Sequence, residues 1–201
     1  MRFGTIGAGT IAQALAHHVI TAGYPVTLAN SRGPSTLSDL VTELGPPASS
    51  GTVAQAAAAD VVFLAVGWPD VPAALAGLPN WGNRILVDTT NVFTLVDGQP
   101  QLADLGEHTG SEIVAQHAPG ARVIKAFNTL YAKYIEPDPR HESGRQVVFY
   151  AGDDAEAKTL IGGLLDEFGF AAVDVGDLRT GGQLMQVGGG PLSALHVLKQ
   201  D

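Results

Sequence analysis

The glycine-rich stretch near the N-terminus carries the clearest chemical pattern in the sequence. Gly7, Gly9 and Ala12 form a G-x-G-x-x-A pattern between an apolar segment and a segment of helical periodicity. In such a turn the first glycine permits a tight bend, the second lets a pyrophosphate approach the backbone, and the alanine allows close helix–strand contact. The amides near Thr10 and Ile11 would then face the phosphates at a positive helix end. The spacing predicts a dinucleotide-binding turn, and the alternative is a tight strand–helix turn that binds nothing.

A second chemical pattern follows the next apolar segment. Asn30, Ser31 and Arg32 stand where an NAD-binding protein usually carries a carboxylate for the ribose hydroxyls. A carboxylate would repel a 2′-phosphate, whereas the planar guanidinium of Arg32 can pair with one, and Ser31 and Ser35 can add hydroxyl donors. We therefore predict NADP(H) as the cofactor. The alternative is that Arg32 is an ordinary solvated surface charge.

Alternating strand-like and helix-like segments must position these residues. Strands are expected at 2–7, 25–30, around 45–51, 60–67, 83–91, 122–128, 145–152 and 170–176, with helices between most of them. This order predicts an α/β fold with a doubly wound, mostly parallel sheet of seven to eight strands and a short C-terminal helical tail. We expect a single dinucleotide-binding domain over 1–201, with a core to about 176 and a tail over about 177–201.

Two local features complete this interpretation. The segment 93–108 is punctuated by glycine and proline and is expected to form a long irregular loop. Asp153 and Glu156 are expected to form a capping box on a helix that Gly169 ends.

Ligands of a doubly wound fold bind outside the carboxyl ends of the strands, so three further strand ends are candidate sites. Asn91 and Asn128 could hydrogen-bond a carboxamide or a ribose, and Trp68 could stack on a ring or simply pack. The expected cofactor-binding residues at these strand ends are Ala65, Val66, Trp68, Asn91, Ala126, Phe127, Asn128 and Thr129.

The sequence has no obvious acid–base pair. Tyr131 and His141 are weak candidates for a proton donor, and His17 and His18 are expected on the surface of the first helix. Hydride transfer between two redox cofactors needs close, correctly facing rings and excluded water, whereas reduction of a carbonyl or imine favours a proton donor. We therefore leave the catalytic residues unassigned and expect no metal site.

Composition excludes several classes of protein. The chain has no cysteine, which excludes disulfides, zinc–thiolate sites, iron–sulfur clusters and thiol catalysis. Its formal net charge of −9 argues against nucleic acid and anionic membranes as partners. No apolar run has the length of a membrane span, and Met1 leads almost directly into a strand, so we expect a cytoplasmic protein.

Several motifs resemble those of the coenzyme F420-dependent NADP oxidoreductase family, which is related to the cytosolic reductase domain of the six-transmembrane metalloreductases. The resemblance covers nearly the whole chain and rests on "TIGAGTIAQALA", "NSRGP", "LAVGW", "VIKAFNTL" and "AGDDAEAKTLIGGLLDEFGF". It implies a Rossmann domain that binds NADP(H), with a deazaflavin or a flavin against the nicotinamide.

The resemblance also implies roles for individual residues. Pyrophosphate would be held by the turn at Gly7 and the helix start, the 2′-phosphate by Ser31 and Arg32, and the nicotinamide would lie beside residues 126–129. The C-terminal segment 184–201 does not match the family, and Asn128 stands where some members carry a histidine.

The function expected from these features is hydride transfer between NADPH and F420 or a flavin. The alternatives are direct reduction of a small carbonyl or imine, and a non-catalytic NADP(H)-binding redox module. Because the nucleotide fold leaves only a short tail to enclose a substrate, a broad cofactor or a pocket completed by a second subunit fits better, and we expect a homodimer.

Overall fold

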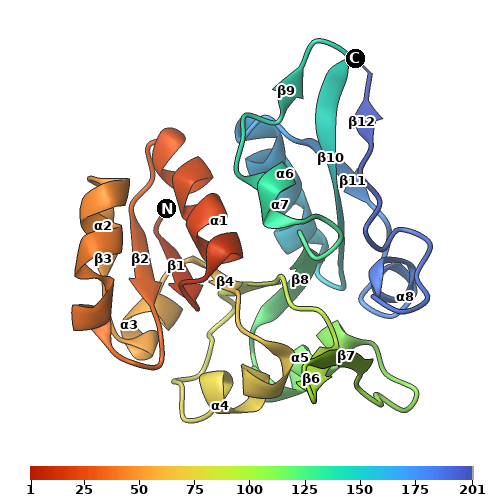
Figure 1. Cartoon of the computed structure of the whole chain (residues 1–201), viewed down its shortest axis with the longest axis horizontal. Coiled ribbons are helices and arrows are strands. Elements are labelled where there is room, and N and C mark those ends of the chain that lie inside the picture. The colour runs from red at the N-terminus through yellow and green to blue at the C-terminus, as the bar shows by residue number, and fades with distance from the viewer. Residues whose placement is uncertain (201) are drawn as a thin grey trace.

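A large twisted sheet organises the computed structural model, which describes residues 1–200 (Figure 1). Its continuous path runs β11-β10-β8-β5-β4-β1-β2-β3. The strands are β1 (Phe3–Ile6), β2 (Val26–Ala29), β3 (Ala48–Ser50), β4 (Val61–Leu64), β5 (Ile85–Asp88), β8 (Arg122–Ala126), β10 (Gly144–Gly152) and β11 (Ala171–Asp174). The short strands β9 (Arg140–His141) and β12 (Leu198–Lys199) pair with β10 and complete a 10-stranded sheet.

The sheet is mostly parallel, as expected. Strands β1, β2, β3, β4, β5 and β8 pair in parallel, and so do β10 and β11. The reversal lies at β10, which is antiparallel to β8, β9 and β12. Parallel pairing brings the carboxyl ends of β1, β2, β4, β5 and β8 to one edge.

Helices cover both faces of the sheet, which explains the uninterrupted apolar runs of the central strands. The helices are α1 (Thr10–Thr21), η1 (Pro34–Leu37), α2 (Ser38–Leu44), α3 (Val53–Ala57), η2 (Trp68–Asp70), α4 (Val71–Leu75), α5 (Gly110–His117), α6 (Ala132–Ile135), α7 (Ala155–Glu167) and α8 (Thr180–Met185). In β4, Val61 and Phe63 join the core beneath α1, α6 and α7, whereas Val62 and Leu64 join the core beneath α3, α4 and α5.

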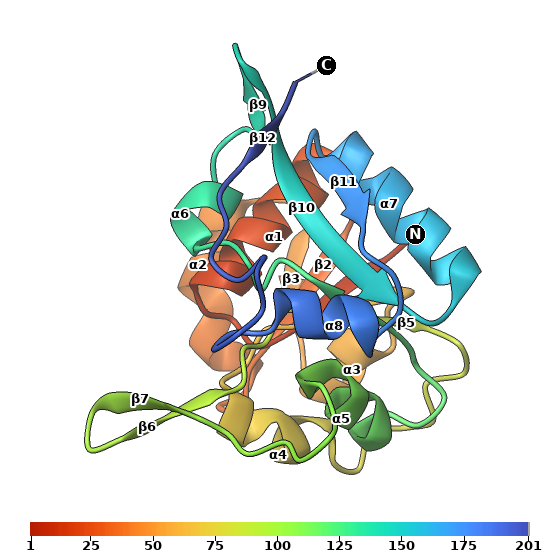
Figure 2. The ribbon, with the colours of Figure 1, turned by 90° about the vertical axis from the view of Figure 1, so that its right-hand side faces the viewer.

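Two local expectations need correction. The segment 93–108 is not wholly irregular, because it begins with a hairpin of β6 (Phe93–Val96) and β7 (Gln99–Leu102) that projects from the body (Figure 2). The exposed strands of this hairpin lack the buried apolar alternation by which strands are recognised. The cap of α7 is Asp154, whose carboxylate accepts from the Ala157 amide, while Asp153 accepts from the Leu178 amide.

The C-terminal segment crosses the carboxyl edge of the sheet. Helix α8 lies against β10, and the chain then passes residues 187–194 before it returns to β10 as β12 (Figure 2). Met185 is fully buried in a third apolar cluster with Val147, Phe149 and Ala171. This placement puts the tail beside the ends of β5 and β8.

Candidate functional site

The turn between β1 and α1 has the backbone that its glycines predict. Gly7 has φ +106°, and its amide donates to the Ala29 carbonyl at 2.9 Å. A Cβ added at Gly7 would lie 2.1 Å from the carbonyl oxygen of Ala65, directly after β4, so no other residue fits without movement. A Cβ at Gly9 would meet nothing within 4 Å.

The start of α1 is open to a ligand. Gly9 is the N-cap residue, and no side chain hydrogen-bonds the first turn of this 12-residue helix. Ala12 is fully buried against the sheet, which fixes the helix close to β1. The free amides and the positive end of the helix dipole suit an anion such as a pyrophosphate.

The end of β2 is shaped by Asn30. The Asn30 Oδ1 accepts from the Arg32 amide at 3.0 Å, and the Asn30 Nδ2 donates to the Thr36 hydroxyl at 2.9 Å. Asn30 therefore holds the turn, while Ser31, Arg32 and Ser35 are exposed. The Arg32 guanidinium forms no ion pair with any residue in the described range 1–200, so it is free to bind an anion.

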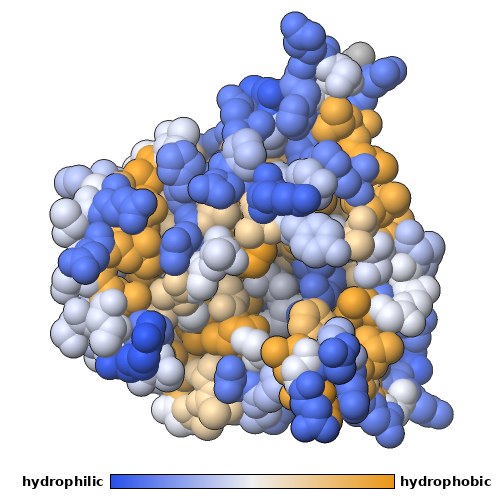
Figure 3. Space-filling view, in the orientation of Figure 1, coloured by the Kyte–Doolittle hydropathy of each residue, from blue (hydrophilic) through white to orange (hydrophobic). Residues whose placement is uncertain are grey.

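A pocket of about 460 Å³ lies between this turn and the end of β4. It is lined by Ile6, Gly7, Asn30, Ser31, Val53, Ala65, Val66, Gly67, Asp70, Ala73, Ala74, Ala76 and Leu78. Trp68 does not line it and packs instead against the core beneath α4 and α5. In Figure 3 the corresponding face is hollowed, with apolar and neutral side chains in the hollow and hydrophilic ones around it.

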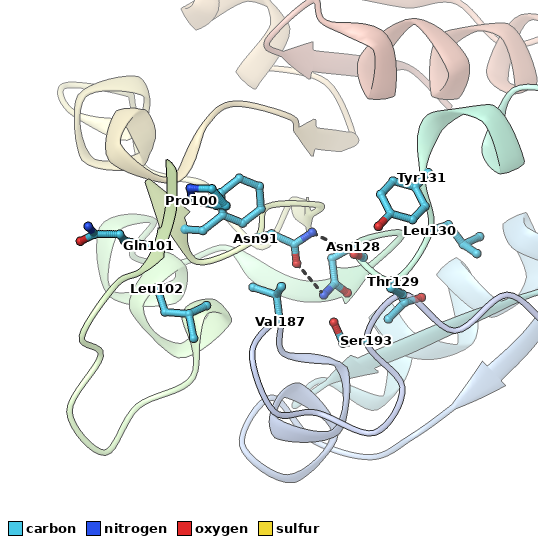
Figure 4. A pocket seen from close by; sticks show the side chains of 12 residues that line it. Asn91, Pro100, Gln101, Leu102, Asn128, Thr129, Leu130, Tyr131, Val187 and Ser193 are labelled. Carbon is cyan, nitrogen blue, oxygen red and sulfur yellow. Dashed lines mark hydrogen bonds between the residues drawn. The ribbon is translucent and has the colours of Figure 1, made fainter. Parts of the chain in front are cut away.

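A second pocket, of about 340 Å³, lies farther along the same edge, at the ends of β5 and β8 (Figure 4). It is lined by Asn91, Phe93, Pro100, Gln101, Leu102, Asn128, Thr129, Leu130, Tyr131, Val187, Ser193 and Ala194. The hairpin and the tail form two of its walls, and the hairpin was not anticipated from the sequence. Gly7 itself lines the first pocket, whereas the second lies past β4 at the ends of β5 and β8.

Asn91 and Asn128 join the floor of this second pocket. The Asn91 Nδ2 donates to the Asn128 backbone carbonyl at 2.9 Å, and the Asn128 Nδ2 donates to the Asn91 Oδ1 at 3.2 Å (Figure 4). The Asn128 Nδ2 also donates to the Met185 carbonyl at 2.9 Å, which ties the tail to the floor. The Asn128 Oδ1 and the Thr129 Oγ1 are buried and have no partner among the described residues.

The side chain of Phe127 points into the core. Its side chain is 2% exposed and packs in the core edge-to-face with Phe63 and Phe170. Its φ of +65° is rare for an aromatic residue, and it turns the chain sharply after β8. Only the backbone of Phe127 can face a ligand at the strand end, and the buried Ala126 likewise contributes no polar group.

The two proton-donor candidates are not equivalent. Tyr131 lines the second pocket at its rim and is 63% exposed. His141 lies on the exposed strand β9 and lines neither pocket. His18, expected on the surface, is buried beside Phe170 and forms a hydrogen bond with the Ile135 carbonyl.

Sequence interpretation missed a buried ionic cluster beneath the second pocket. Lys125 pairs with Asp88 at 3.0 Å, and their side chains are 5% and 0% exposed. The Ser111 hydroxyl donates to the same carboxylate at 2.6 Å. A lysine and an aspartate within two otherwise apolar strands were the available signal, because such charges are buried only when paired.

Two negative findings apply to the part of the chain that the structure describes. No group of three or more histidine, aspartate or glutamate side chains is arranged to hold a metal ion among residues 1–200. Within the same range, no helix combines the length and apolarity that crossing a membrane requires.

Comparison with known proteins agrees with this geometry. Residues 2–92, which include the glycine turn, the end of β2 and the end of β5, match the family described as NADP oxidoreductase, coenzyme F420-dependent. The protein SMa0349 from Sinorhizobium meliloti, of unassigned function, is 38% identical with a TM-score of 0.91, over 100% of this chain and 96% of that one. The N-terminal part of the chain, residues 2–92, thus matches a domain of the F420-dependent NADP oxidoreductase family.

Two further relatives carry functional descriptions. A protein from Arthrobacter sp. FB24 assigned as an F420-dependent NADP reductase is 29% identical with a TM-score of 0.79, over 90% of this chain and 86% of that one. The rat metalloreductase STEAP3 is 27% identical over 183 residues, which are 89% of this chain and 34% of that protein. The chain thus spans about a third of the length of this metalloreductase.

Proposed function

We propose that this protein is an NADP(H)-dependent oxidoreductase that transfers hydride between NADPH and a deazaflavin such as F420, or a flavin. The observation that carries the proposal is the pair of pockets along one edge of the sheet, the first lined by Gly7 and the second at the ends of β5 and β8. This edge is where doubly wound folds bind ligands. The family match over residues 2–92 supports the same chemistry.

In the proposed complex, the nucleotide crosses the glycine turn. Gly7, Gly9 and the amides of Thr10 and Ile11 hold the pyrophosphate at the start of α1. Ser31, Arg32 and Ser35 bind the 2′-phosphate, and Ala65 and Val66 line the adenosine side. The nicotinamide then lies over Asn91, Asn128 and Thr129, where two buried polar atoms lack partners. Unpartnered buried polar atoms are rare, and a bound polar ring would relieve their cost.

The character of the second pocket favours a flat redox cofactor as the hydride acceptor. Tyr131 is the one ionisable side chain among the described residues that line it, and the remaining lining is apolar or neutral. NADPH would give its hydride to the acceptor ring, and the accompanying proton would come from solvent at the open side of the pocket. The chain's contribution is to hold two rings in contact and to exclude water between them.

One observation favours a second candidate function. The hydroxyl-bearing Tyr131 stands at the pocket rim, where it could protonate a carbonyl or imine as NADPH reduces it. In that case a small polar substrate would occupy the space beside the nicotinamide. The exposure of Tyr131 weakens this candidate, because an exposed hydroxyl is poorly oriented as a proton donor.

Purified protein, NADPH and separate candidate acceptors test these proposals. Bleaching of oxidised F420 or of a flavin, together with loss of the NADPH absorbance, would support the first. Turnover limited to a panel of carbonyls and imines would support the second. Tight NADPH binding with no turnover of any acceptor would favour a non-catalytic redox module and would refute both enzymatic proposals.

The homodimer is a separate proposal. Exposed apolar side chains lie on the hairpin and near the tail, namely Phe93, Leu95, Val96, Leu102, Tyr131, Leu184 and Leu195. A second subunit would cover such a surface and narrow the open pocket. Sedimentation velocity of wild type and Leu95→Glu would test it, and a monomeric wild type would refute it.

A further inference from the structure

The Asp88–Lys125 ion pair lies beneath the floor of the second pocket and links β5 to β8. Asp88 ends β5, Lys125 lies on β8, and the two residues are direct partners in the parallel register. Each charged residue precedes one of the two pocket asparagines by three positions, Asp88 before Asn91 and Lys125 before Asn128. The ion pair and the amide pair are therefore two successive cross-links between the same strand ends.

The hydrogen bonds of the ion pair converge on Thr90. The Asp88 Oδ1 accepts from the Thr90 amide at 2.9 Å and from its hydroxyl at 2.7 Å. The Lys125 ammonium donates to the Thr90 carbonyl as well as to the Asp88 Oδ2. All three polar groups of Thr90 are thus held by the ion pair, so the chain leaving β5 has little freedom at this point.

Asn91 receives this constraint directly, because it follows Thr90. Its amide group then meets Asn128 through the two hydrogen bonds of the pocket floor. Since the Asn91 Nδ2 is committed to a backbone carbonyl, its Oδ1 must face the Asn128 Nδ2. The orientation of both amides therefore depends on where the ion pair holds Thr90.

Stability alone does not explain such a pair. Removing two charges from water costs several kcal/mol per ion, and replacement of a buried pair by apolar residues is often neutral or stabilising. A buried pair that fixes geometry at a pocket floor has a use that an apolar pair lacks, because its hydrogen bonds are directional.

We propose that Lys125 and Asp88 are positioning residues that hold the Asn91–Asn128 amide pair against the nicotinamide end of NADPH. The inference rests on the proposed function. It assigns neither residue a contact with the nucleotide. The adenosine end lies in the other pocket, whose lining includes none of these four residues.

Calorimetry with two probes separates positioning from a general structural role. NADPH spans both pockets, whereas 2′,5′-ADP carries the adenosine half and lacks the nicotinamide. Lys125→Met should weaken the binding of NADPH by about tenfold or more, because misplacing a contact by about 1 Å can cost as much as about 100-fold. The same variant should bind 2′,5′-ADP with nearly the affinity of wild type. Lys158→Met is the matched control, because Lys158 pairs with Asp174 at 3.1 Å outside both pockets.

A double-mutant cycle tests whether Lys125 acts through the amide pair. In an Asn91→Ala background, Lys125→Met should reduce the affinity for NADPH much less than it does in wild type. The effects of substitutions at residues that act through one another are not additive. If Lys125→Met alone does not fold, the doubly neutral variant Asp88→Asn/Lys125→Met replaces it in the same comparison, since it leaves no unpaired buried charge.

The outcomes are distinct. Three results would each overturn the inference while leaving the proposed function standing. The first is an equal loss of affinity for NADPH and 2′,5′-ADP, and the second is no loss of affinity for either in a folded variant. The third is the same loss of NADPH affinity with and without Asn91. Failure of wild type to bind NADPH would overturn both.

Discussion

Gly7 on the first turn and Ala65 at the end of β4 approach so closely that a methyl group at Gly7 would lie 2.1 Å from the Ala65 carbonyl oxygen. This contact closes the turn against its neighbouring strand and leaves the start of α1 facing outward. Gly9, only two positions later, has open space where a side chain would be. The fold thus excludes a side chain at Gly7 but not at Gly9, for which we propose a role in binding the pyrophosphate.

Alanine substitutions at the two glycines should separate these purposes. Gly7→Ala should destabilise the protein by more than about 1 kcal/mol, because a φ of +106° and the contact with Ala65 both reject a Cβ. Gly9→Ala should fold with nearly unchanged stability. It should still weaken the binding of NADPH, because its methyl group would occupy the space proposed for the pyrophosphate. Chemical denaturation and calorimetry measure the two effects, and equal behaviour of the variants would contradict the assignment.

Arg32→Glu should weaken the binding of NADPH far more than the binding of NADH. Each charge-assisted hydrogen bond lost with the 2′-phosphate contributes about 1.5–3 kcal/mol, which corresponds to roughly tenfold or more in Kd. Arg32→Lys should give an intermediate loss, since it keeps the charge without the planar fork. Arg140→Glu, an exposed site on β9, controls for the change in net charge. Equal weakening of both nucleotides would remove Arg32 from the discriminator role.

Tyr131→Phe should distinguish the two enzymatic proposals. The substitution removes the one phenolic hydroxyl that lines the second pocket and keeps the ring. If the acceptor is F420 or a flavin, kcat should change little, because the proton is taken from solvent. A carbonyl or imine reductase using Tyr131 should lose about 100-fold in kcat. Tyr24→Phe is the control, because Tyr24 lines neither pocket and its hydroxyl donates a hydrogen bond to Glu167.

Stability should fall as the pH is lowered through about 6.5, and His18 should cause part of the fall. Burial lowers the pKa of His18 from its usual value of 6.5, so the unfolded chain takes up a proton before the native one does. Native stability is then complete above pH 6.5 and decreases below it, by at most about 1.4 kcal/mol per pH unit, until the lower native pKa is reached.

Denaturation of His18→Gln and His17→Gln between pH 5.5 and 7.5 would measure this contribution, because the difference from wild type isolates each residue. The His18 variant should show a flatter pH dependence than wild type. The exposed His17 serves as its control on the same helix and should leave the slope unchanged. An unchanged slope in the His18 variant would show that its titration does not differ between the folded and unfolded states.

Local sequence patterns determined the framework of this protein. Glycine spacing after β1, apolar runs in β4 and β5, and helical periodicity along α7 each depend on neighbours within a few positions, so the doubly wound sheet and the glycine turn could be predicted. The same holds for the candidate phosphate residues, since Asn30, Ser31 and Arg32 directly follow a recognisable strand.

Tertiary structure alone decided what surrounds the second pocket. The hairpin, the tail and the ends of β5 and β8 meet there from distant parts of the chain. Contacts such as Asn91 with Asn128, 37 positions apart, leave no periodic trace in sequence. The side chain of Phe127 turned into the core because its left-handed backbone reverses the direction that strand alternation implies. The pairing of Lys125 with Asp88 likewise became visible only when parallel pairing set the two strands in register, because a charge is buried according to its partner and not according to its neighbours in sequence.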